Sequence, residues 1–171
     1  PTSRLYAAVI CFGIFALGTS CMITWFDEYL GNVGRLAQNE LLQKLAFLDD
    51  LTGVLNRSAF DRDCKTIAEQ SDITFVMFDI NGLKSTNDTW GHVIGDQLIQ
   101  SAAKLITDTF QPVGTVYRIG GDEFVAILQG ASETTTAELL QTFAERMQGQ
   151  TIDHAIPVRI AYGAASTREV D

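Results

Sequence analysis

The chain has 171 residues, with 21 Asp and Glu against 12 Lys and Arg, so its formal net charge is −9 at neutral pH. This acidic balance argues against nucleic acid or an anionic membrane surface as the main partner, because both would repel the chain. The length suits one domain of ordinary size with a short appendage. The spacing of Cys11, Cys21 and Cys64 matches neither a disulfide framework nor a zinc site.

Residues 5–26 contain no charged side chain. As a helix they would extend about 33 Å at roughly 1.5 Å per residue, which is enough to cross a bilayer. Tyr6 and Trp25, near the two ends, suit the two membrane interfaces. A buried core helix is the alternative, and a cleaved signal peptide is disfavoured because its apolar region usually spans only about 7–15 residues. We therefore predict a transmembrane helix within residues 1–26.

Residues 27–49 are predicted to form a helical signalling linker. An apolar residue recurs there at intervals of three or four, which makes one stripe along a helix. The stripe consists of Leu30, Val33, Ala37, Leu41, Leu45 and Leu48. It covers about two to three heptads, fewer than a coiled coil needs for identification. Two alternatives stay open, namely a linker that packs on its own domain and a coiled coil of two chains.

The apolar run from Ile73 to Phe78 predicts a central strand buried on both faces. The run ends at Asp79, and a buried strand should not end in a carboxylate that has no role. Asp79 is therefore a candidate metal ligand, together with the backbone carbonyl of Ile80.

Two apolar stretches, residues 116–119 and 124–128, predict the strands of a hairpin. Gly120 and Gly121 form its tip and leave room for backbone to approach a phosphate. Asp122 and Glu123 follow directly, and an ordinary hairpin with a charged, solvated tip is the alternative. If the strand that ends at Asp79 lies beside this hairpin, the three carboxylates converge. Mg²⁺ prefers such oxygen ligands and would relieve their mutual repulsion.

Four motifs, in this order, resemble the GGDEF family of diguanylate cyclases. They are residues 50–57 (DLTGVLNR), residues 79–88 (DINGLKSTND), residues 91–96 (GHVIGD) and residues 120–124 (GGDEF). The resemblance implies an α/β fold like the palm of nucleotide cyclases and polymerases, with a mostly antiparallel central sheet flanked by helices. Residues 56–70 and 134–148 are the expected covering helices. The GGDEF domain is expected at residues 50–171, truncated before the final helix that supplies Lys and Arg to the triphosphate.

The resemblance also implies the reaction, in which two GTP condense into cyclic di-GMP and pyrophosphate. A 3′-hydroxyl attacks an α-phosphate with the help of two Mg²⁺ ions per site, Mn²⁺ being the alternative ion. In this family pattern Asp79, the Ile80 carbonyl, Asp122 and Glu123 surround the metals. Either Asp122 or Glu123 accepts the hydroxyl proton. Lys84 meets the triphosphate, the alternative being an ordinary surface lysine.

Asn87 and Asp96 match the family positions that recognise guanine. A carboxylate can accept hydrogen bonds from guanine N1–H and from the exocyclic amine together, which adenine does not offer. A helix-start role for Asp96 and a turn or capping role for Asn87 are the alternatives. Gly120 and Gly121 are expected to lie against the phosphates.

The sequence departs from the family pattern in one four-residue stretch and at one single residue. Gln111-Pro112-Val113-Gly114 stands where many members carry an Arg-x-x-Asp product-inhibition site. The missing guanidinium predicts that product does not inhibit through this stretch. Gly82 stands where members often have an aromatic residue.

These expectations describe a membrane-tethered diguanylate cyclase that acts in bacterial second-messenger signal transduction. The domain is expected to face the cytoplasm from the inner membrane, because GTP is there, and to work as a homodimer. The fragment as written is expected to be weakly active or inactive, since cations for the triphosphate are missing. The alternative function is a non-catalytic GGDEF-type domain that binds GTP or a partner.

Overall fold

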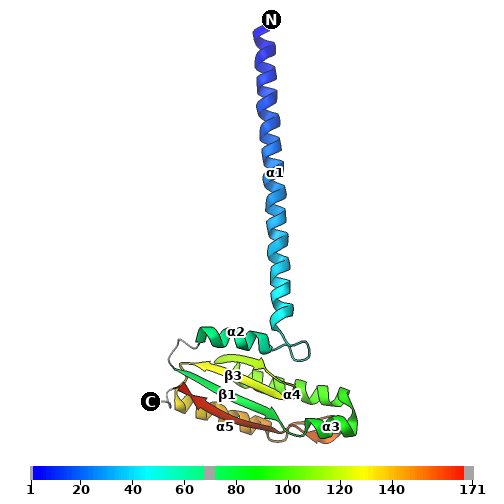
Figure 1. Ribbon diagram of the computed structural model, residues 1–171, viewed down its shortest axis with the longest axis vertical. Helices are drawn as coiled ribbons and strands as arrows, with labels where there is room; N and C mark the ends of the chain where they lie inside the picture. Colours follow the sequence, from blue (N-terminus) through cyan, green and yellow to red (C-terminus); the bar gives the residue numbers. More distant parts are fainter. Residues whose placement is uncertain (1, 68–71, 168–171) are drawn as a thin grey trace. The chain divides into compact units, whose positions relative to one another are not determined.

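A computed structural model describes residues 2–67 and 72–167 of the chain (Figure 1). The chain divides into two units, Pro1–Leu45 and Ala46–Asp171. The first contains most of helix α1 (Thr2–Phe47). The second contains α2 (Arg57–Ile67), β1 (Ile73–Ile80), α3 (Leu83–Trp90), α4 (His92–Phe110), β2 (Gly114–Arg118), β3 (Glu123–Gln129), α5 (Glu133–Met147), β4 (Thr151–Ile152), a 3₁₀ turn (Asp153–Ala155), β5 (Ile156–Pro157) and β6 (Ile160–Ser166).

The main sheet has four strands in the order β2-β3-β1-β6, and every neighbouring pair is antiparallel. The predicted hairpin is therefore β2 and β3, and β3 lies directly beside β1. Strands β4 and β5 form a separate two-stranded sheet. The α/β fold with an antiparallel central sheet is confirmed.

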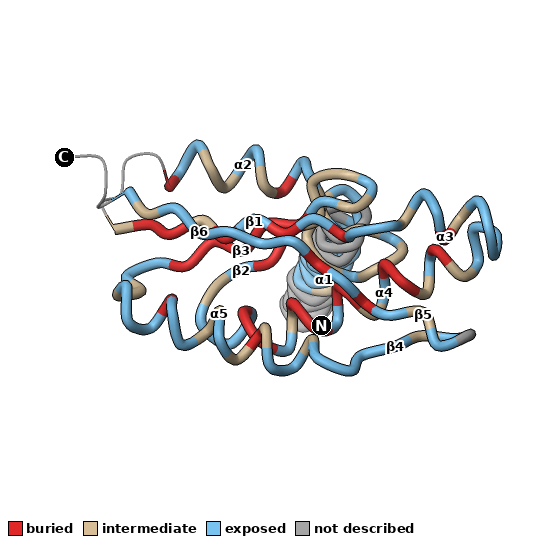
Figure 2. Tube along the Cα trace, turned by 90° about the horizontal axis from the view of Figure 1, so that it is seen from below, coloured by how far each residue is buried: buried red, intermediate tan, exposed pale blue. Residues whose placement is uncertain are grey.

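One face of the sheet carries the larger hydrophobic core. Val76, Phe78 and Ile80 on β1 are buried there, against residues of α4 and α5. Phe78 meets Phe110 of α4 and Phe143 of α5 edge-on, with ring centroids 5.1 Å and 5.2 Å apart. Figure 2 shows α5 on one side of the strands and α2 on the other. Because side chains alternate along a strand, every second residue of β1 points into this core.

The opposite face is covered only in part. A smaller core joins Ala59 of α2 to Ile73, Tyr117 and Ile127 of the sheet. Farther along β1, Met77 is 51% exposed, and Asp79 is exposed as well. The prediction that this strand is buried on both faces is therefore wrong. The α2 core reaches only one end of the strand and leaves the end at Asp79 open.

The two predicted covering helices are present. The first, expected at residues 56–70, is α2 (Arg57–Ile67), and residues 68–70 of that prediction lie outside the described residues. The second, expected at residues 134–148, is α5 (Glu133–Met147). It begins after Ser132, whose hydroxyl accepts a hydrogen bond from the Thr135 amide at 3.0 Å and so caps the helix.

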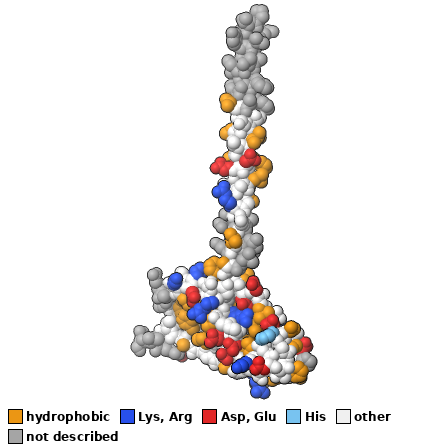
Figure 3. Space-filling view, turned by 45° about the vertical axis from the view of Figure 1, so that its right-hand side comes forward, with side chains coloured by type: hydrophobic (Ala, Val, Ile, Leu, Met, Phe, Trp, Pro, Cys, Tyr) orange, Lys and Arg blue, Asp and Glu red, His pale blue; other side chains and the backbone are white. Residues whose placement is uncertain are grey.

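Helix α1 runs without a break through both predicted N-terminal segments. Its apolar side chains at Trp25, Phe26 and Leu30 are 63%, 54% and 51% exposed. Figure 3 shows hydrophobic side chains along its described surface, with acidic and basic ones among them. Within the described part of the chain, no helix combines the length and the apolar character that crossing a bilayer requires. Side chains 5–16 of the predicted span lie outside the described residues, so the span stays a prediction.

Candidate active site

The open end of the sheet brings together carboxylates that are far apart in sequence. Asp79, the second-last residue of β1, is the register partner of Glu123, the first residue of β3. The Ile80 amide donates a hydrogen bond to the Asp122 carbonyl at 3.0 Å. The predicted neighbourhood of β1 and the Gly-Gly hairpin is therefore confirmed at the level of the backbone.

A shallow cavity of about 350 Å³ lies at this end of the sheet. Its lining consists of Met77, Phe78, Asp79, Glu123, Ala161, Tyr162 and Gly163. Two carboxylates thus face one hollow on the uncovered side of β1. On β6 the lining alternates the small residues Ala161 and Gly163 with Tyr162 between them.

Among the residues that the structure describes, no three His, Cys, Asp or Glu side chains form a group that could hold a metal ion. The expected convergence of three carboxylates is therefore not seen. Asp122 lies in the bend before β3 and does not line the hollow, whereas Asp79 and Glu123 do. The donor set still fits Mg²⁺, which usually takes one or two carboxylates and completes its shell with substrate phosphates and water.

The Gly-Gly turn holds the Glu123 backbone and leaves room for its side chain. The amides of Ile119 and Gly120 both donate to the Glu123 carbonyl, at 2.9 Å and 3.3 Å. A Cβ added at Gly120 would lie 2.5 Å from Glu123 Oε2, whereas one added at Gly121 would meet nothing within 4 Å. The two glycines therefore differ in role, because Gly120 makes room for Glu123 and Gly121 keeps an open surface on which a phosphate could rest.

Lys84 lies in the first turn of α3 and is exposed. Gly82 precedes this helix with φ 81° and ψ 10°, a left-handed conformation that glycine adopts without strain. This conformation accounts for glycine at a position where the family often has an aromatic residue. Gly82 lies between the end of β1, which carries Asp79, and the start of α3, which carries Lys84.

Asn87 and Asp96 come from consecutive helices that pack together. A Cβ at Gly95 would overlap the Asn87 side chain, so α4 approaches α3 closely at this point. Gly91, between the helices, has φ 84° and ψ 166°, a conformation almost restricted to glycine. The partly buried Asn87 side chain therefore lies against the residue next to the exposed Asp96. The structure brings together the two residues predicted to recognise guanine.

The stretch Gln111–Gly114 connects α4 to β2. Gln111, Pro112 and Val113 are exposed and present no charge to a ligand. The absence of product inhibition through this stretch stays a prediction.

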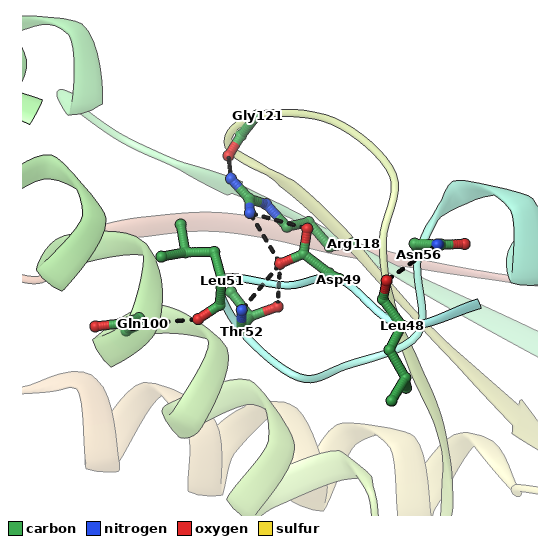
Figure 4. A network of polar contacts seen from close by, with 8 residues as sticks. All are labelled: Leu48, Asp49, Leu51, Thr52, Asn56, Gln100, Arg118 and Gly121. Atoms are coloured by element: carbon green, nitrogen blue, oxygen red, sulfur yellow. Dashed lines mark hydrogen bonds and ion pairs between the residues drawn. The ribbon is translucent and has the colours of Figure 1, made fainter. Parts of the chain in front are cut away.

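An ion pair that the sequence analysis missed lies behind the Gly-Gly turn (Figure 4). Arg118, the last residue of β2, donates through Nη1 to both carboxylate oxygens of Asp49, at 2.9 Å and 3.1 Å. Its Nη2 donates to the Gly121 carbonyl at 2.7 Å. Burial raises the pKa of Asp49, but hydrogen bonds from Thr52 and Arg118 and the Arg118 charge outweigh it, so the pKa lies below its usual value. The only local signal was Asp49 three residues before Thr52, a spacing typical of a turn.

Comparison with known proteins shows the family to which the sequence and the fold are similar. Residues 46–171 match the family described as "Diguanylate cyclase, GGDEF domain". The probable diguanylate cyclase DgcI of Escherichia coli (strain K12) is 37% identical over 126 residues, covering 72% of this chain and 27% of that protein. The cyclic di-GMP phosphodiesterase PdeB of Shewanella oneidensis is 30% identical over 142 residues, covering 76% of this chain and 17% of that protein. The chain thus spans less than a third of either relative.

Among solved structures, the coiled coil and GGDEF domain of DgcB from Caulobacter crescentus, in complex with c-di-GMP, superposes with a TM-score of 0.70. The sequences are 26% identical, and the match covers 84% of this chain and 81% of that chain. The similarity therefore extends over both sequence and fold.

Proposed function

Since this chain belongs to the GGDEF domain family of diguanylate cyclases, we propose that its site joins two GTP molecules into cyclic di-GMP and pyrophosphate. The observation that carries the proposal is the pairing of Asp79 with Glu123, next to Asp122, at the uncovered end of the sheet. These carboxylates come from two strands and a glycine turn. Such a concentration of negative charge beside an open hollow fits an ion-bridged triphosphate better than an uncharged ligand.

The proposed metal ligands are Asp79 and the Ile80 carbonyl, with Glu123 on the same hollow and Asp122 in the adjoining bend as the further carboxylates. The ion is Mg²⁺, two per site, with Mn²⁺ as the alternative. When bound, Mg²⁺ neutralises triphosphate charge and lowers the pKa of the attacking 3′-hydroxyl.

The remaining roles belong to side chains around the turn. Glu123 or Asp122 accepts the proton of the 3′-hydroxyl, because both lie at the end of the sheet where that hydroxyl would bind. Lys84 balances charge on the triphosphate. Asn87 and Asp96 select guanine, since a carboxylate left without the N1–H and amine donors would lose its hydrogen bonds with another base. The open surface at Gly121 receives a phosphate.

Each chain holds one GTP, so catalysis needs two chains face to face. We propose that residues 27–48 pair two copies through exposed apolar side chains such as Leu30 and Val33, which are 51% and 46% exposed. The solved DgcB structure comprises a coiled coil and a GGDEF domain, which supports this pairing. The predicted span at residues 5–26 would tether the pair to the inner membrane with the site in the cytoplasm.

A second candidate function is a non-catalytic domain that binds GTP or a partner. The match to PdeB, whose name is that of a phosphodiesterase, favours it, because a similar sequence occurs in a protein named for the opposite activity. The retention of Asp79, Asn87, Asp96 and the GGDEF turn in this chain favours catalysis.

The test is incubation of the full-length protein with GTP and Mg²⁺, with chromatography and mass spectrometry for cyclic di-GMP. We expect product from GTP, none from ATP, and at least about 100-fold less from the Asp79→Asn variant. GTP binding without product would establish the non-catalytic alternative. Absence of both binding and product would overturn the assignment to GTP chemistry.

A further inference from the structure

Arg118 connects three segments of the second unit: strand β2, the loop before α2 and the Gly-Gly turn. Its backbone amide donates to the Leu55 carbonyl at 2.7 Å, so it pairs with the loop before α2 rather than only with the sheet. Its guanidinium reaches Asp49 in the same loop and the Gly121 carbonyl in the turn. The Arg118 side chain is 12% exposed, so water competes little for these contacts.

Asp49, the partner of Arg118 in the ion pair, is also held by several hydrogen bonds. Asp49 Oδ1 accepts from the Thr52 amide at 3.0 Å and from the Thr52 hydroxyl at 2.6 Å, in addition to Arg118. The Asp49 amide and carbonyl bond to Val54 and Gly53, each at 2.8 Å. Figure 4 shows the Arg118 guanidinium between the Asp49 carboxylate of this loop and the Gly121 carbonyl of the turn. The carboxylate has little freedom to follow Arg118 if the guanidinium moves.

We propose that Arg118 and Asp49 are positioning residues for the Gly-Gly turn. Arg118 holds the Gly121 carbonyl, and Asp49 fixes the direction of the guanidinium. Together they set where the turn places Glu123 and the open surface at Gly121. The inference rests on the proposed cyclase function for its kinetic consequence, while the geometric part stands by itself.

The geometry distinguishes this role from simple stabilisation. A bond that only stabilised the domain could end on any carbonyl, but the 2.7 Å contact ends on the exposed turn directly before the two carboxylates. Backbone hydrogen bonds hold the turn at Ile119, Gly120 and Asp122, and Arg118 adds a side-chain hydrogen bond at the Gly121 carbonyl. A planar guanidinium can bind a carboxylate and a carbonyl at fixed angles, whereas an ammonium group cannot reproduce that fork.

The consequence is that the loop of residues 49–55 governs the active turn. This loop is the first part of the second unit after α1 along the chain. A shift of the loop would move Arg118 and, through it, the Gly121 carbonyl. Small displacements of a catalytic group are costly, on the order of 100-fold in rate for a misplacement of about 1 Å.

The test uses Asp49→Asn and Arg118→Lys in the full-length protein, with Asp108→Asn as the matched control. Asp108 forms an exposed ion pair with Lys104 at 2.9 Å, so this control also removes one carboxylate charge. Three quantities are measured for each variant: kcat and KM for GTP, thermal unfolding, and hydrogen–deuterium exchange of peptides that cover residues 114–124.

We expect Asp49→Asn and Arg118→Lys to lower kcat by about tenfold or more, with KM changed less than about threefold and the protein folded at the assay temperature. Exchange at the turn should become faster in both variants and stay unchanged in Asp108→Asn. A kcat loss no larger than in the control, or one that follows only the unfolded fraction, would overturn the proposal. If the unsubstituted protein makes no product, the cyclase assignment fails, and exchange at the turn alone decides the positioning role.

Discussion

The two sides of strand β1 differ in what their residues do. On one side Val76, Phe78 and Ile80 are at most 2% exposed and pack under α4 and α5. On the other side Met77 and Asp79 are open to solvent. A strand alternates its side chains between its two faces. Consecutive residues of β1 therefore alternate between the buried core, which stabilises the fold, and the open face, which carries the candidate site.

This separation explains how charge collects at the site without weakening the fold. Asp79 and Glu123 face each other across the open side, where water and a bound cation can solvate them. The same pair inside the α4 and α5 core would pay a large desolvation penalty. Substitutions at neighbouring positions should consequently separate activity from stability.

The largest expected effect is on activity, in Asp79→Asn. Loss of a candidate metal ligand should lower cyclic di-GMP production by about 100-fold or more. The free energy of unfolding should change by less than about 0.5 kcal/mol, because the side chain is exposed. Turnover assays and urea unfolding measure the two quantities. A stability loss as large as that of a core variant would show that the two sides are not separate.

The next effect is on stability, in Phe78→Ala. This residue is 2% exposed and contacts the rings of Phe110 and Phe143. Truncation should lower the free energy of unfolding by about 3–5 kcal/mol, since it removes buried area and leaves a cavity. Met77→Ala, at a position that is 51% exposed, is the neighbouring control and should cost less than about 1 kcal/mol. Equal losses at both positions, measured by urea unfolding, would contradict the difference between the two sides.

A smaller effect is expected at the packing of α3 and α4. In Gly95→Ala the new methyl group would displace Asn87, so the KM for GTP should rise by about tenfold and the preference for GTP over ATP should fall. Gly34→Ala is the control, because it places the same methyl in a helix where nothing lies within 4 Å. Competition binding of GTP and ATP measures the preference. If Gly95→Ala keeps the same preference for GTP over ATP, Asn87 does not take part in recognising the base.

Several features of the site followed from sequence because they depend on local pattern. The apolar run of β1 with Asp79 at its end, and the glycines ahead of two carboxylates, both lie within short stretches. The meeting of those stretches followed only from the family resemblance. The exposure of Met77 did not follow from the sequence, because an unbroken apolar run conceals which side of a strand has no helix above it.

The ion pair of Arg118 and Asp49 shows the limit of such reasoning more clearly. The two residues are 69 positions apart, and neither belongs to a spacing that indicates a site. Their contact results from the loop of residues 49–55 closing beside β2, where Leu55 bridges to Tyr117. A pairing of this kind depends on tertiary register, which local propensity does not determine.

The smallest expected effect is the pH dependence of the Asp49 contribution to stability. The folded protein holds the pKa of Asp49 below its usual value of 3.8, so the carboxylate stabilises the fold fully above about pH 4. Its contribution is lost as the pH falls below 3.8 and through the folded-state pKa, because the unfolded chain then binds the proton more readily. Asp49→Asn removes this contribution at every pH.

The free energy of unfolding should therefore be about 2 kcal/mol lower in Asp49→Asn than in the unsubstituted protein at pH 6, the usual range for hydrogen bonds to a charged group. The difference should shrink as the pH is lowered from 3.8 toward the folded-state pKa, because the native carboxyl is then increasingly protonated. Asp108→Asn, at a side chain that is 51% exposed, should differ by less than about 0.5 kcal/mol across the range. A gap for Asp49→Asn that stays constant from pH 6 to pH 3 would show that shape and packing, rather than the charge of Asp49, hold Arg118 against the turn.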